Sequence, residues 1–423
     1  MHVIVIGAGI IGSTTALALV ERGIRVTLLE STARAGSMTS YANGSSITPG
    51  HAEPWNPPGT LSRMIPALVS DHQPWRIRAR ALPGLWHWGL RFLAESRPSR
   101  YYANAGHCIR LGYYARRCLA DWRQRHEFDY DQQTGGSLEL YFSESSLKHA
   151  LTLRQRIGEP EIDFRRIDAG ELVDLEPALQ PVADRVHGTL LFPNHESGDA
   201  RRFSALAAER AGALGADLRF SAPVDAIEIR SGGFRSVQVA GKTIEADACI
   251  VSAGCATPAL LGPLGLKTPI YPVKGYSATI SLEPGDPAPE MPLLDLERRF
   301  VTARLGPDRL RIAGLAEFAG FDREIRNDRI QRLLDSASIL LPDLAARIQS
   351  AEPNPWSGLR PMTPDGAPLI GPTPIDGLHL NCGHGAMGWT QACGSAELVA
   401  DLVAGNRPAI DPDGLLATRY LGA

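Results

Sequence analysis

The sequence predicts an α/β chain, α+β overall, in which a domain with a parallel sheet is interleaved with a domain that has an antiparallel sheet. Three observations support this prediction. A buried strand, a glycine-rich turn and an amphipathic helix open the chain. Similar features return after about residue 202 and again in the last seventy residues. The segments between them are rich in aromatic and arginine side chains, which indicates a second structural unit.

The first thirty residues are expected to form one β-α-β unit. An apolar run over Val3–Ile6 predicts a buried strand, and the pattern from about Ile11 to Arg22 predicts an amphipathic helix that ends at Gly23. A second strand is expected over Arg25–Leu29. A strand, a short turn and a helix in this order are typical of a mononucleotide-binding half of a parallel sheet.

The turn between the first strand and the helix, Gly7-Ala8-Gly9-Ile10-Ile11-Gly12, has the spacing of a dinucleotide-binding turn. Gly7 permits the tight turn, Gly9 lets a pyrophosphate approach the backbone, and Gly12 lets the helix pack closely. Glu30 ends the second strand, where its carboxylate is placed to accept hydrogen bonds from a ribose. The unit therefore predicts a Rossmann-like site for a dinucleotide, and NAD and FAD both fit it.

Later elements give the expected domain plan. Strands or helices are expected in this order: a strand over 137–142, a helix over 203–214, a strand over 217–220, a hairpin around 232–233, strands over 248–251, 276–280 and 309–313, and helices over 328–340 and 389–403. We assign residues 1–50, 186–265 and 356–423 to the cofactor-binding domain. The substrate-binding domain is expected over 51–185 and 266–355.

Composition and charge exclude several classes of protein. With 43 Lys and Arg against 46 Asp and Glu, the net charge of -3 gives no field that attracts nucleic acid or an anionic membrane. The six cysteines form no pair or Cys/His group at zinc spacing, so we expect no metal site and free thiols in a reducing compartment. The first strand begins at the second residue, and the apolar stretch over 246–266 is broken by prolines and glycines. We therefore expect a cytoplasmic, water-soluble protein.

Seven further segments resemble one family of flavoproteins. They are Thr39–Gly44, Pro49–Trp55, Pro223–Ile227, Asp247–Gly254, Tyr271–Ser277, Trp356–Gly366 and Gly383–Thr390. Together they extend over the whole chain, which resembles the D-amino acid dehydrogenase branch (small subunit type) of the D-amino acid oxidase and glycine oxidase superfamily of FAD-dependent oxidoreductases.

The resemblance implies that the dinucleotide is FAD. The residues expected to bind it are Gly7, Gly9, Ile10, Ile11, Gly12, Glu30, Ser40, Asn43, Gly44, Val224, Gly254, Gly383, Gly385, Gly388, Trp389 and Thr390. A Gly-His-Gly loop that opens a helix presents backbone amides and the positive helix end to the flavin pyrimidine ring. Non-covalent binding is expected, because the cysteine that attaches flavin in sarcosine oxidases would fall near Met362, where this chain has none.

The resemblance also implies a substrate site. Arg360, held between Leu359 and Pro361, is expected to bind an amino acid carboxylate through two parallel hydrogen bonds. Tyr276 is a candidate catalytic and substrate-binding residue or a core tyrosine, and Lys274 is a candidate substrate contact or a solvated lysine. His384 is a candidate catalytic residue, or a residue that shapes the loop or contacts flavin.

The activity implied is oxidation of a D-amino acid by hydride transfer to flavin N5, followed by hydrolysis to a 2-oxo acid and ammonia. The electrons are expected to pass to a quinone or another electron carrier instead of oxygen, and a peripheral contact with the inner face of the cell membrane is compatible with this. His51, a candidate substrate contact, replaces the tyrosine that the resemblance leads us to expect, so the preferred side chain stays open. The oligomeric state stays open too.

Two alternatives to this activity remain at this level. One is an oxidase or dehydrogenase of a cyclic or N-alkylated amino acid, such as D-proline, hydroxy-D-proline or sarcosine. The other is a non-catalytic subunit that carries FAD within a larger assembly.

Overall fold

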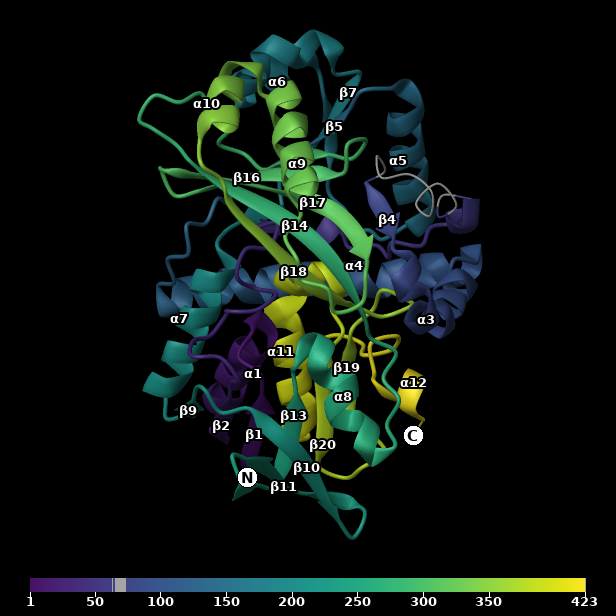
Figure 1. The fold of residues 1–423 in the computed structure, drawn as a ribbon, viewed down its shortest axis with the longest axis vertical. Helices are drawn as coiled ribbons and strands as arrows, with labels where there is room; N and C mark the ends of the chain where they lie inside the picture. Colours follow the sequence, from purple (N-terminus) through teal and green to yellow (C-terminus); the bar gives the residue numbers. More distant parts are fainter. Residues whose placement is uncertain (63, 65–73, 423) are drawn as a thin grey trace.

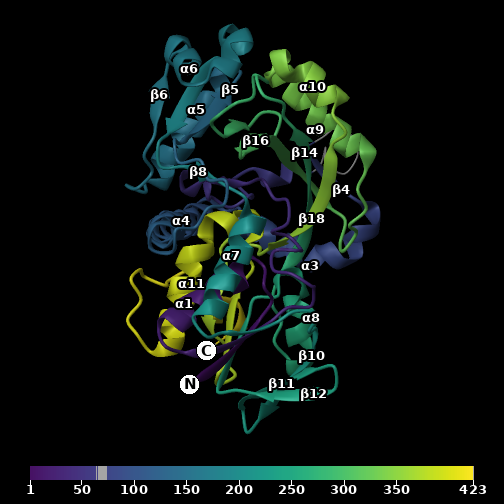
Figure 2. The ribbon, with the colours of Figure 1, turned by 90° about the vertical axis from the view of Figure 1, so that its left-hand side faces the viewer.

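The computed structural model describes residues 1–62, 64 and 74–422, and its two largest sheets are stacked along the long axis of the molecule (Figure 1). Both chain termini lie in the lower part, beside the smaller sheet (Figure 2). The expected mixture of a parallel and an antiparallel sheet is therefore confirmed. The arrangement also shows that the chain passes between the two parts several times, because early, middle and late segments occur in each.

The smaller sheet has the strand order β19-β20-β13-β1-β2-β9. In chain order its strands are β1 (His2–Ile6), β2 (Arg25–Leu29), β9 (Asp217–Arg219), β13 (Ala248–Val251), β19 (Leu369–Pro372) and β20 (Leu378–Cys382). All neighbouring strands are parallel except β19 and β20. The apolar runs of β1 and β13 are buried on both faces, as parallel strands covered by helices require.

Helices cover this sheet and join it to the rest of the chain. The helix α1 (Ile10–Glu21) packs between α7 (Ala200–Ala213) and α11 (Gly388–Ala404). The helix α7 begins three residues earlier than expected, because the Asp199 side chain accepts hydrogen bonds from the first backbone amides. The bounds of α1, α11, β1, β2, β9 and β13 lie within one or two residues of expectation, whereas the sequence analysis does not predict β19 and β20.

The larger sheet has nine strands in the order β18-β14-β17-β16-β15-β5-β7-β6, with β4 beside β17. Its strands are β4 (Trp75–Ile77), β5 (Ser137–Tyr141), β6 (Arg165–Ile167), β7 (Gly188–Phe192), β14 (Tyr271–Ser281), β15 (Leu293–Asp295), β16 (Phe300–Leu305), β17 (Arg309–Phe318) and β18 (Asn354–Met362). Most pairs are antiparallel, and β15–β5 and β17–β4 are parallel. The helix α9 (Asn327–Leu340) buries its apolar face against β14 and β17.

The remaining elements are short or peripheral. The helices are α3 (Leu82–Glu95), α5 (Glu144–Ile157), α6 (Ala169–Leu175), α8 (Thr257–Leu261), α10 (Ala345–Ser350) and α12 (Thr418–Leu421). The 3₁₀ helices are η1 (Pro49–His51), η2 (Ala79–Ala81), η3 (Pro177–Arg185), η4 (Gly254–Ala256), η5 (Gly262–Leu264), η6 (Pro342–Leu344) and η7 (Gly385–Met387). Two small sheets contain β3 (Ser46–Ile47) with β8 (Glu196–Ser197), and β10 (Val224–Arg230) with β11 (Gly233–Val239) and β12 (Lys242–Glu245).

Two strands extend the larger sheet into segments that we assigned to the cofactor-binding domain. Strand β7 lies within 186–265 and pairs with β5, while β18 crosses residue 356 and pairs with β14 over its full length. The glycine and prolines of β18 obscure its strand pattern, and its long antiparallel ladder with β14 overrides them. The domain limits themselves stay a prediction.

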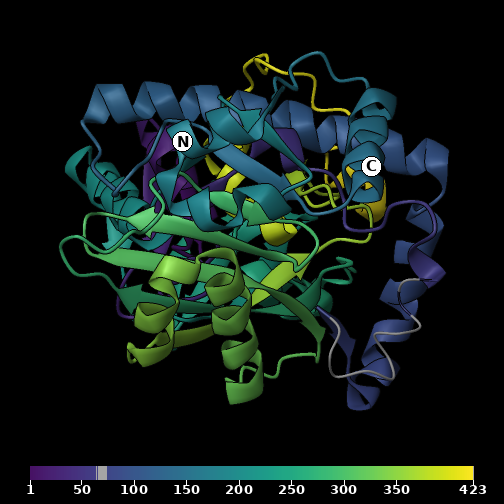
Figure 3. The ribbon, with the colours of Figure 1, turned by 90° about the horizontal axis from the view of Figure 1, so that it is seen from above.

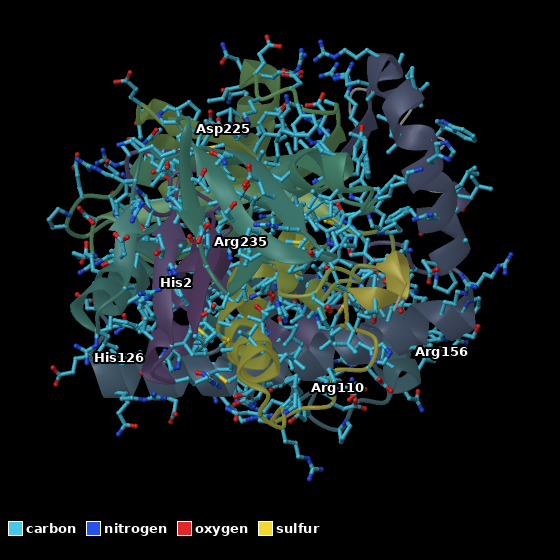
Figure 4. All side chains as sticks on the ribbon, turned by 90° about the horizontal axis from the view of Figure 1, so that it is seen from below. His2, Arg110, His126, Arg156, Asp225 and Arg235 are labelled. Carbon is cyan, nitrogen blue, oxygen red and sulfur yellow. The ribbon has the colours of Figure 1, made fainter. Side chains whose placement is uncertain are left out.

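A long helix, α4 (Pro98–His126), runs across the molecule along one of its sides (Figure 3). It packs against α11 of the smaller sheet and against η1. Its Arg110 donates hydrogen bonds to the carbonyl oxygens of Asp411 and Asp413 in the C-terminal segment (Figure 4). A Cβ atom on Gly394 of α11 would lie 2.8 Å from the backbone of Ala115, so the two helices touch backbone to backbone here.

We predict that Gly394→Ala lowers the free energy of unfolding by about 1–3 kcal/mol, because the added methyl group must push α4 away from α11. Urea unfolding measures the loss. The matched control is Gly89→Ala in α3, where a Cβ atom would meet only Leu85 Cγ at 3.9 Å. The control is expected to be neutral or stabilising by up to about 1 kcal/mol. Equal stability of Gly394→Ala and the parent would show that the close contact between Gly394 and Ala115 does not contribute to the packing of α4 on α11.

Candidate active site

The glycine turn has the geometry that its sequence predicts. Gly7 has a φ of +99°, and its amide donates a hydrogen bond to the Leu29 carbonyl oxygen over 2.7 Å. A Cβ atom on Gly12 would lie 1.7 Å from the Gly7 carbonyl oxygen, so only glycine permits this approach of helix and turn. Near Gly9 such an atom would meet only the Ser40 hydroxyl, at 3.6 Å, which leaves the backbone there accessible.

The carboxylate of Glu30 lies beside this turn. One carboxylate oxygen accepts a hydrogen bond from the Ala8 amide over 2.7 Å, and the other accepts from the Thr32 amide over 2.8 Å. A backbone hydrogen bond holds the segment just before Val224 beside Glu30, because the Ala222 amide donates to the Glu30 carbonyl oxygen. Gly254 follows the adjacent β13, so the structure brings Val224 and Gly254 to the end of the sheet where the turn lies.

A cavity of about 920 Å³ opens where the glycine turn faces the larger sheet. Its lining includes eleven predicted site residues: Ile10, Ser40, Asn43, Gly44, His51, Tyr276, Arg360, Gly385, Gly388, Trp389 and Thr390. The Ser40 hydroxyl accepts a hydrogen bond from the Ile10 amide, which links the cavity to the turn. Ile11, Lys274, Gly383 and His384 are not among the lining residues. The predicted residues therefore form two connected groups, one at the turn and one around the cavity.

Arg360 contributes an unpaired positive charge to the cavity. Its guanidinium donates a hydrogen bond to the Leu315 carbonyl oxygen over 2.9 Å and lies 5.1 Å from the ring centre of Trp55. Within the residues that the structure describes, no carboxylate lies in ion-pair range of it. Burial lowers the pKa of Arg360 to about 10, so it stays protonated at neutral pH. A half-buried, unpaired guanidinium fork at a cavity is a site for an anion.

The backbone around Arg360 is shaped to hold it. The register between β14 and β17 shifts between Lys274 and Tyr276, and Leu315 has a φ of +61°, which leucine adopts at a cost. A Cβ atom on Gly275 would lie 2.3 Å from the Arg360 guanidinium. The irregular ladder thus directs a carbonyl oxygen at the guanidinium, and the glycine leaves room for it.

Tyr276 and Lys274 belong to a buried cluster around Glu317. The Tyr276 hydroxyl donates to the Glu317 carboxylate, whose other oxygen accepts from Arg78. The Lys274 ammonium lies 3.5 Å from Glu317 and 3.6 Å from Asp322, and its side chain is fully buried. Lys274 is therefore neither solvated nor part of the cavity lining, because these carboxylates hold it inside the sheet. Burial raises the pKa of Tyr276, and the hydrogen bond to Glu317 raises it further.

His51 faces an acidic residue that the sequence analysis did not select. Its Nδ1 atom lies 3.0 Å from a carboxylate oxygen of Glu53, and both side chains line the cavity. Burial opposes the charge on His51, but the charge of Glu53, its hydrogen bond to the imidazole and the charge of Glu139 together outweigh burial and raise the pKa of the imidazole. The same pairing holds the pKa of Glu53 at about 2 against its own burial. The neighbouring Trp55, which covers Arg360, was also not selected, although both residues lie in the Pro49–Trp55 segment.

Comparison with known proteins identifies the family. The family model described as "FAD dependent oxidoreductase" matches residues 2–402. The chain belongs to the FAD-dependent oxidoreductases. The D-amino acid dehydrogenase of Paramagnetospirillum magneticum is 41% identical over 425 residues, which cover 99% of each chain. That of Rhizobium johnstonii is 37% identical over 420 residues, which cover 99% of this chain and all of the relative.

Two solved structures share this fold. Glycine oxidase from Geobacillus kaustophilus superposes with a TM-score of 0.73 at 25% identity, with 99% of each chain covered. L-proline dehydrogenase from P. horikoshii gives a TM-score of 0.76 at 16% identity, covering 99% of this chain and 96% of that one. The oxidoreductase has no helix, among its described residues, that is long and apolar enough to span a membrane.

The residues present fit the FAD of this family. Ser45 lines the cavity with a buried hydroxyl that has no hydrogen-bond partner in the structure. His384 begins the loop before α11, and both of its buried ring nitrogens also lack partners. Burial lowers the pKa of His384 to about 3. The Ser45 hydroxyl at the cavity, and the His384 ring next to the lining residue Gly385, are unsatisfied polar groups that a polar ligand would complete.

The pKa of His384 predicts a pH dependence of stability. Because the folded-state pKa lies below the unfolded value of about 6.5, stability is lost as the pH falls from about 6.5 toward about 3. Between pH 7 and pH 5 the loss from this residue is up to about 2 kcal/mol. Urea unfolding at both pH values should show a smaller loss for His384→Gln than for the parent. Equal losses would mean that His384 is protonated in the folded protein.

Proposed function

We propose that this oxidoreductase is a D-amino acid dehydrogenase, which converts D-amino acids into 2-oxo acids and ammonia. The observation that carries the proposal is the unpaired guanidinium of Arg360 in a cavity that also receives the loop before α11. The two relatives named D-amino acid dehydrogenase support it, since they match over nearly the full chain. Neither name favours a cyclic or N-alkylated amino acid or a non-catalytic subunit.

Arg360 would bind the substrate carboxylate. Its pKa of about 10 leaves the side chain charged at neutral pH, and the Trp55 ring covers one face of it and limits access by water. A carboxylate that forms two parallel hydrogen bonds with the guanidinium fixes the amino acid in position and direction. The Leu315 carbonyl oxygen holds the fork in place from the side of β17.

The opposite wall of the cavity would hold the cofactor. The turn at Gly7–Gly12 and Glu30 would bind the dinucleotide, while Gly385–Thr390 would contact the flavin. Bound FAD supplies the capacity to accept two electrons from the substrate. Because Gly388, Trp389 and Thr390 form the first turn of α11, their amides and the positive helix end favour negative charge beside them.

The protonation of His384 and the hydrogen bond of Tyr276 limit what each residue can do in the reaction. His384, with a pKa of about 3, is neutral at physiological pH and is therefore not a proton donor there. The Tyr276 hydroxyl proton is committed to Glu317, so its oxygen is available only to accept a hydrogen bond, for example from a substrate amine. These groups are suited to a substrate that binds as the neutral amine and needs no dedicated base for its α-hydrogen.

The electrons would pass to a quinone or another carrier that is not oxygen. We also propose a peripheral contact with the inner face of the cell membrane as the place of this transfer. Rapid hydrogen peroxide formation in air during turnover would contradict the choice of acceptor.

Anaerobic flavin reduction tests the proposed substrate class. The purified flavoprotein, mixed separately with D- and L-amino acids, D-proline, hydroxy-D-proline and sarcosine, should lose its yellow colour with D-amino acids and not with L-amino acids. Bleaching by sarcosine or the cyclic amino acids alone would replace the proposed substrate class. The absence of bleaching by every member of the panel would contradict catalysis of this kind.

Replacement of Arg360 tests the carboxylate site. Arg360→Ala should raise KM for the D-amino acid about ten- to hundredfold through loss of a charge-assisted pair. The KM of Arg360→Lys should lie between those of the parent and Arg360→Ala, because lysine keeps the positive charge but cannot form two parallel hydrogen bonds. The control is Arg235→Ala on the three-stranded sheet, where the arginine pairs with Glu245 (Figure 4). Steady-state kinetics with a dye acceptor give the comparison, and an unchanged KM in Arg360→Ala would remove Arg360 from the substrate site.

A further inference from the structure

One segment of the chain carries three side chains that line the cavity in a row. His51, Glu53 and Trp55 all line it and are partly exposed, while the two residues between them are buried. The alternation, together with the contact between His51 and Glu53 over 3.0 Å, places the three side chains on one face of the segment. We call these three residues the cavity row.

Contacts at both ends of the segment hold the cavity row in place. Before the row, the Gly50 amide donates a hydrogen bond to His195 Nε2 over 3.1 Å. After the row, the buried side-chain amide of Asn56 donates to the carbonyl oxygens of Phe92 and Pro364. The side chains of the row are therefore supported by fixed backbone, which is what a site that selects its ligand requires.

The cavity row begins beside the proposed carboxylate site. The Trp55 ring centre lies 5.1 Å from the Arg360 guanidinium carbon. Glu53 stands two positions before Trp55, so the two backbones are at most about 7 Å apart. His51 comes next, in contact with Glu53. An amino acid whose carboxylate is bound by Arg360 therefore has an aromatic ring, and then a carboxylate, within reach of its side chain.

Glu53 keeps part of its charged surface open to the cavity. Its side chain is 13% exposed, and among the described residues only the His51 imidazole lies in ion-pair range of it. Its pKa of about 2 means that it is ionised throughout the physiological range. A carboxylate that is largely shielded from water and has a single, titratable partner is a suitable site for a cation from a ligand.

The charges around His51 determine which ligand charge the site accepts. Arg154 is neutralised by Glu139, and burial holds the pKa of His195 well below its usual value, so His195 is uncharged. His51, whose pKa is raised, is the member of this group that changes charge near neutral pH. When a cation enters, His51 can release its proton to solvent. An anion would find no such compensation, because neither His195 nor Glu53 takes up a proton near neutral pH.

We propose that the cavity row selects D-amino acids with a cationic side chain, such as D-lysine, D-ornithine and D-arginine, by pairing the side-chain cation with Glu53. The cation takes the place of the His51 proton as the partner of the carboxylate. The Trp55 ring supplies an apolar surface for the carbon stem of the side chain. This inference rests on the proposed function, because Arg360 must bind the carboxylate of the same substrate.

A comparison of two substrates of similar shape tests the selection in the unaltered protein. D-Norleucine has the carbon chain of D-lysine and lacks its ammonium group. Steady-state kinetics with a dye acceptor should give a kcat/KM for D-lysine at least about tenfold above that for D-norleucine, since a charge-assisted pair is gained. D-Glutamate should be used less efficiently than D-norleucine, because its second carboxylate meets Glu53.

Two variants and a control assign the selection to the row. Glu53→Gln should reduce the ratio of kcat/KM for D-lysine to that for D-norleucine by about ten- to hundredfold, mainly through KM for D-lysine. The matched control is Glu297→Gln, which removes another carboxylate of the cavity lining, one that accepts hydrogen bonds from Ser143 and Ser146. It should change the ratio by less than about threefold.

The exchange of a proton for the ligand cation predicts a pH dependence. In the parent, KM for D-lysine should rise as the pH falls from about 8 to about 6, because protonated His51 competes for Glu53. KM for D-norleucine should show no such rise. His51→Gln should remove the rise for D-lysine, and a rise that persists in this variant would contradict the exchange.

The remaining outcomes separate this inference from the proposed function. Equal kcat/KM for D-lysine and D-norleucine in the parent would overturn the selection, as would equal losses in Glu53→Gln and Glu297→Gln. A preference for D-glutamate would assign the row to an anionic side chain and overturn it too. Absence of flavin bleaching by every D-amino acid would contradict the proposed function itself, whereas bleaching without preference for D-lysine would contradict the cavity row alone.

Discussion

The half-buried, unpaired charge of Arg360 is the constraint around which the cavity is arranged. Desolvation of a guanidinium is costly unless neighbouring groups compensate for the lost water. Here the compensation comes from three separate parts of the chain: the Leu315 carbonyl oxygen, the face of Trp55 and the space left by Gly275. Leu315 adopts a left-handed backbone conformation to provide its carbonyl. The backbone distortion of the sheet thus lies at the residue whose carbonyl oxygen accepts the hydrogen bond from Arg360.

A second set of buried charges in the same sheet has the opposite character. Lys274 is one strand away from Arg360 and just as positive, but Glu317 and Asp322 neutralise it. A fully paired cluster fixes the loops that supply its members, whereas an unpaired cation remains available to a ligand. Lys274 and Arg360 differ in whether the fold brings a carboxylate into ion-pair range, and this depends on contacts between positions far apart in the chain.

The local signals in the sequence predicted the cofactor side of the molecule well. The strand, glycine turn and helix lie within one residue of their expected bounds, because backbone geometry and burial there depend on neighbouring residues. Strand β18 was not recognised as a strand, since only its pairing with β14 reveals it. Lys274 was left undecided for the same reason. The pairing of Glu53 with His51 had a signal in the sequence, since the two residues stand two positions apart on the Pro49–Trp55 segment, but their contact is seen only in the structure.

The long helix α4 has a consequence for how the site exchanges its contents. It contacts α11 backbone to backbone, and the paired strands β14, β17 and β18 of the larger sheet line one wall of the cavity. A hinge motion that separated the two parts as rigid bodies would have to break these contacts at once. Entry of substrate and departure of product therefore depend on local opening of loops and side chains, and the rate of such opening sets an upper limit on turnover.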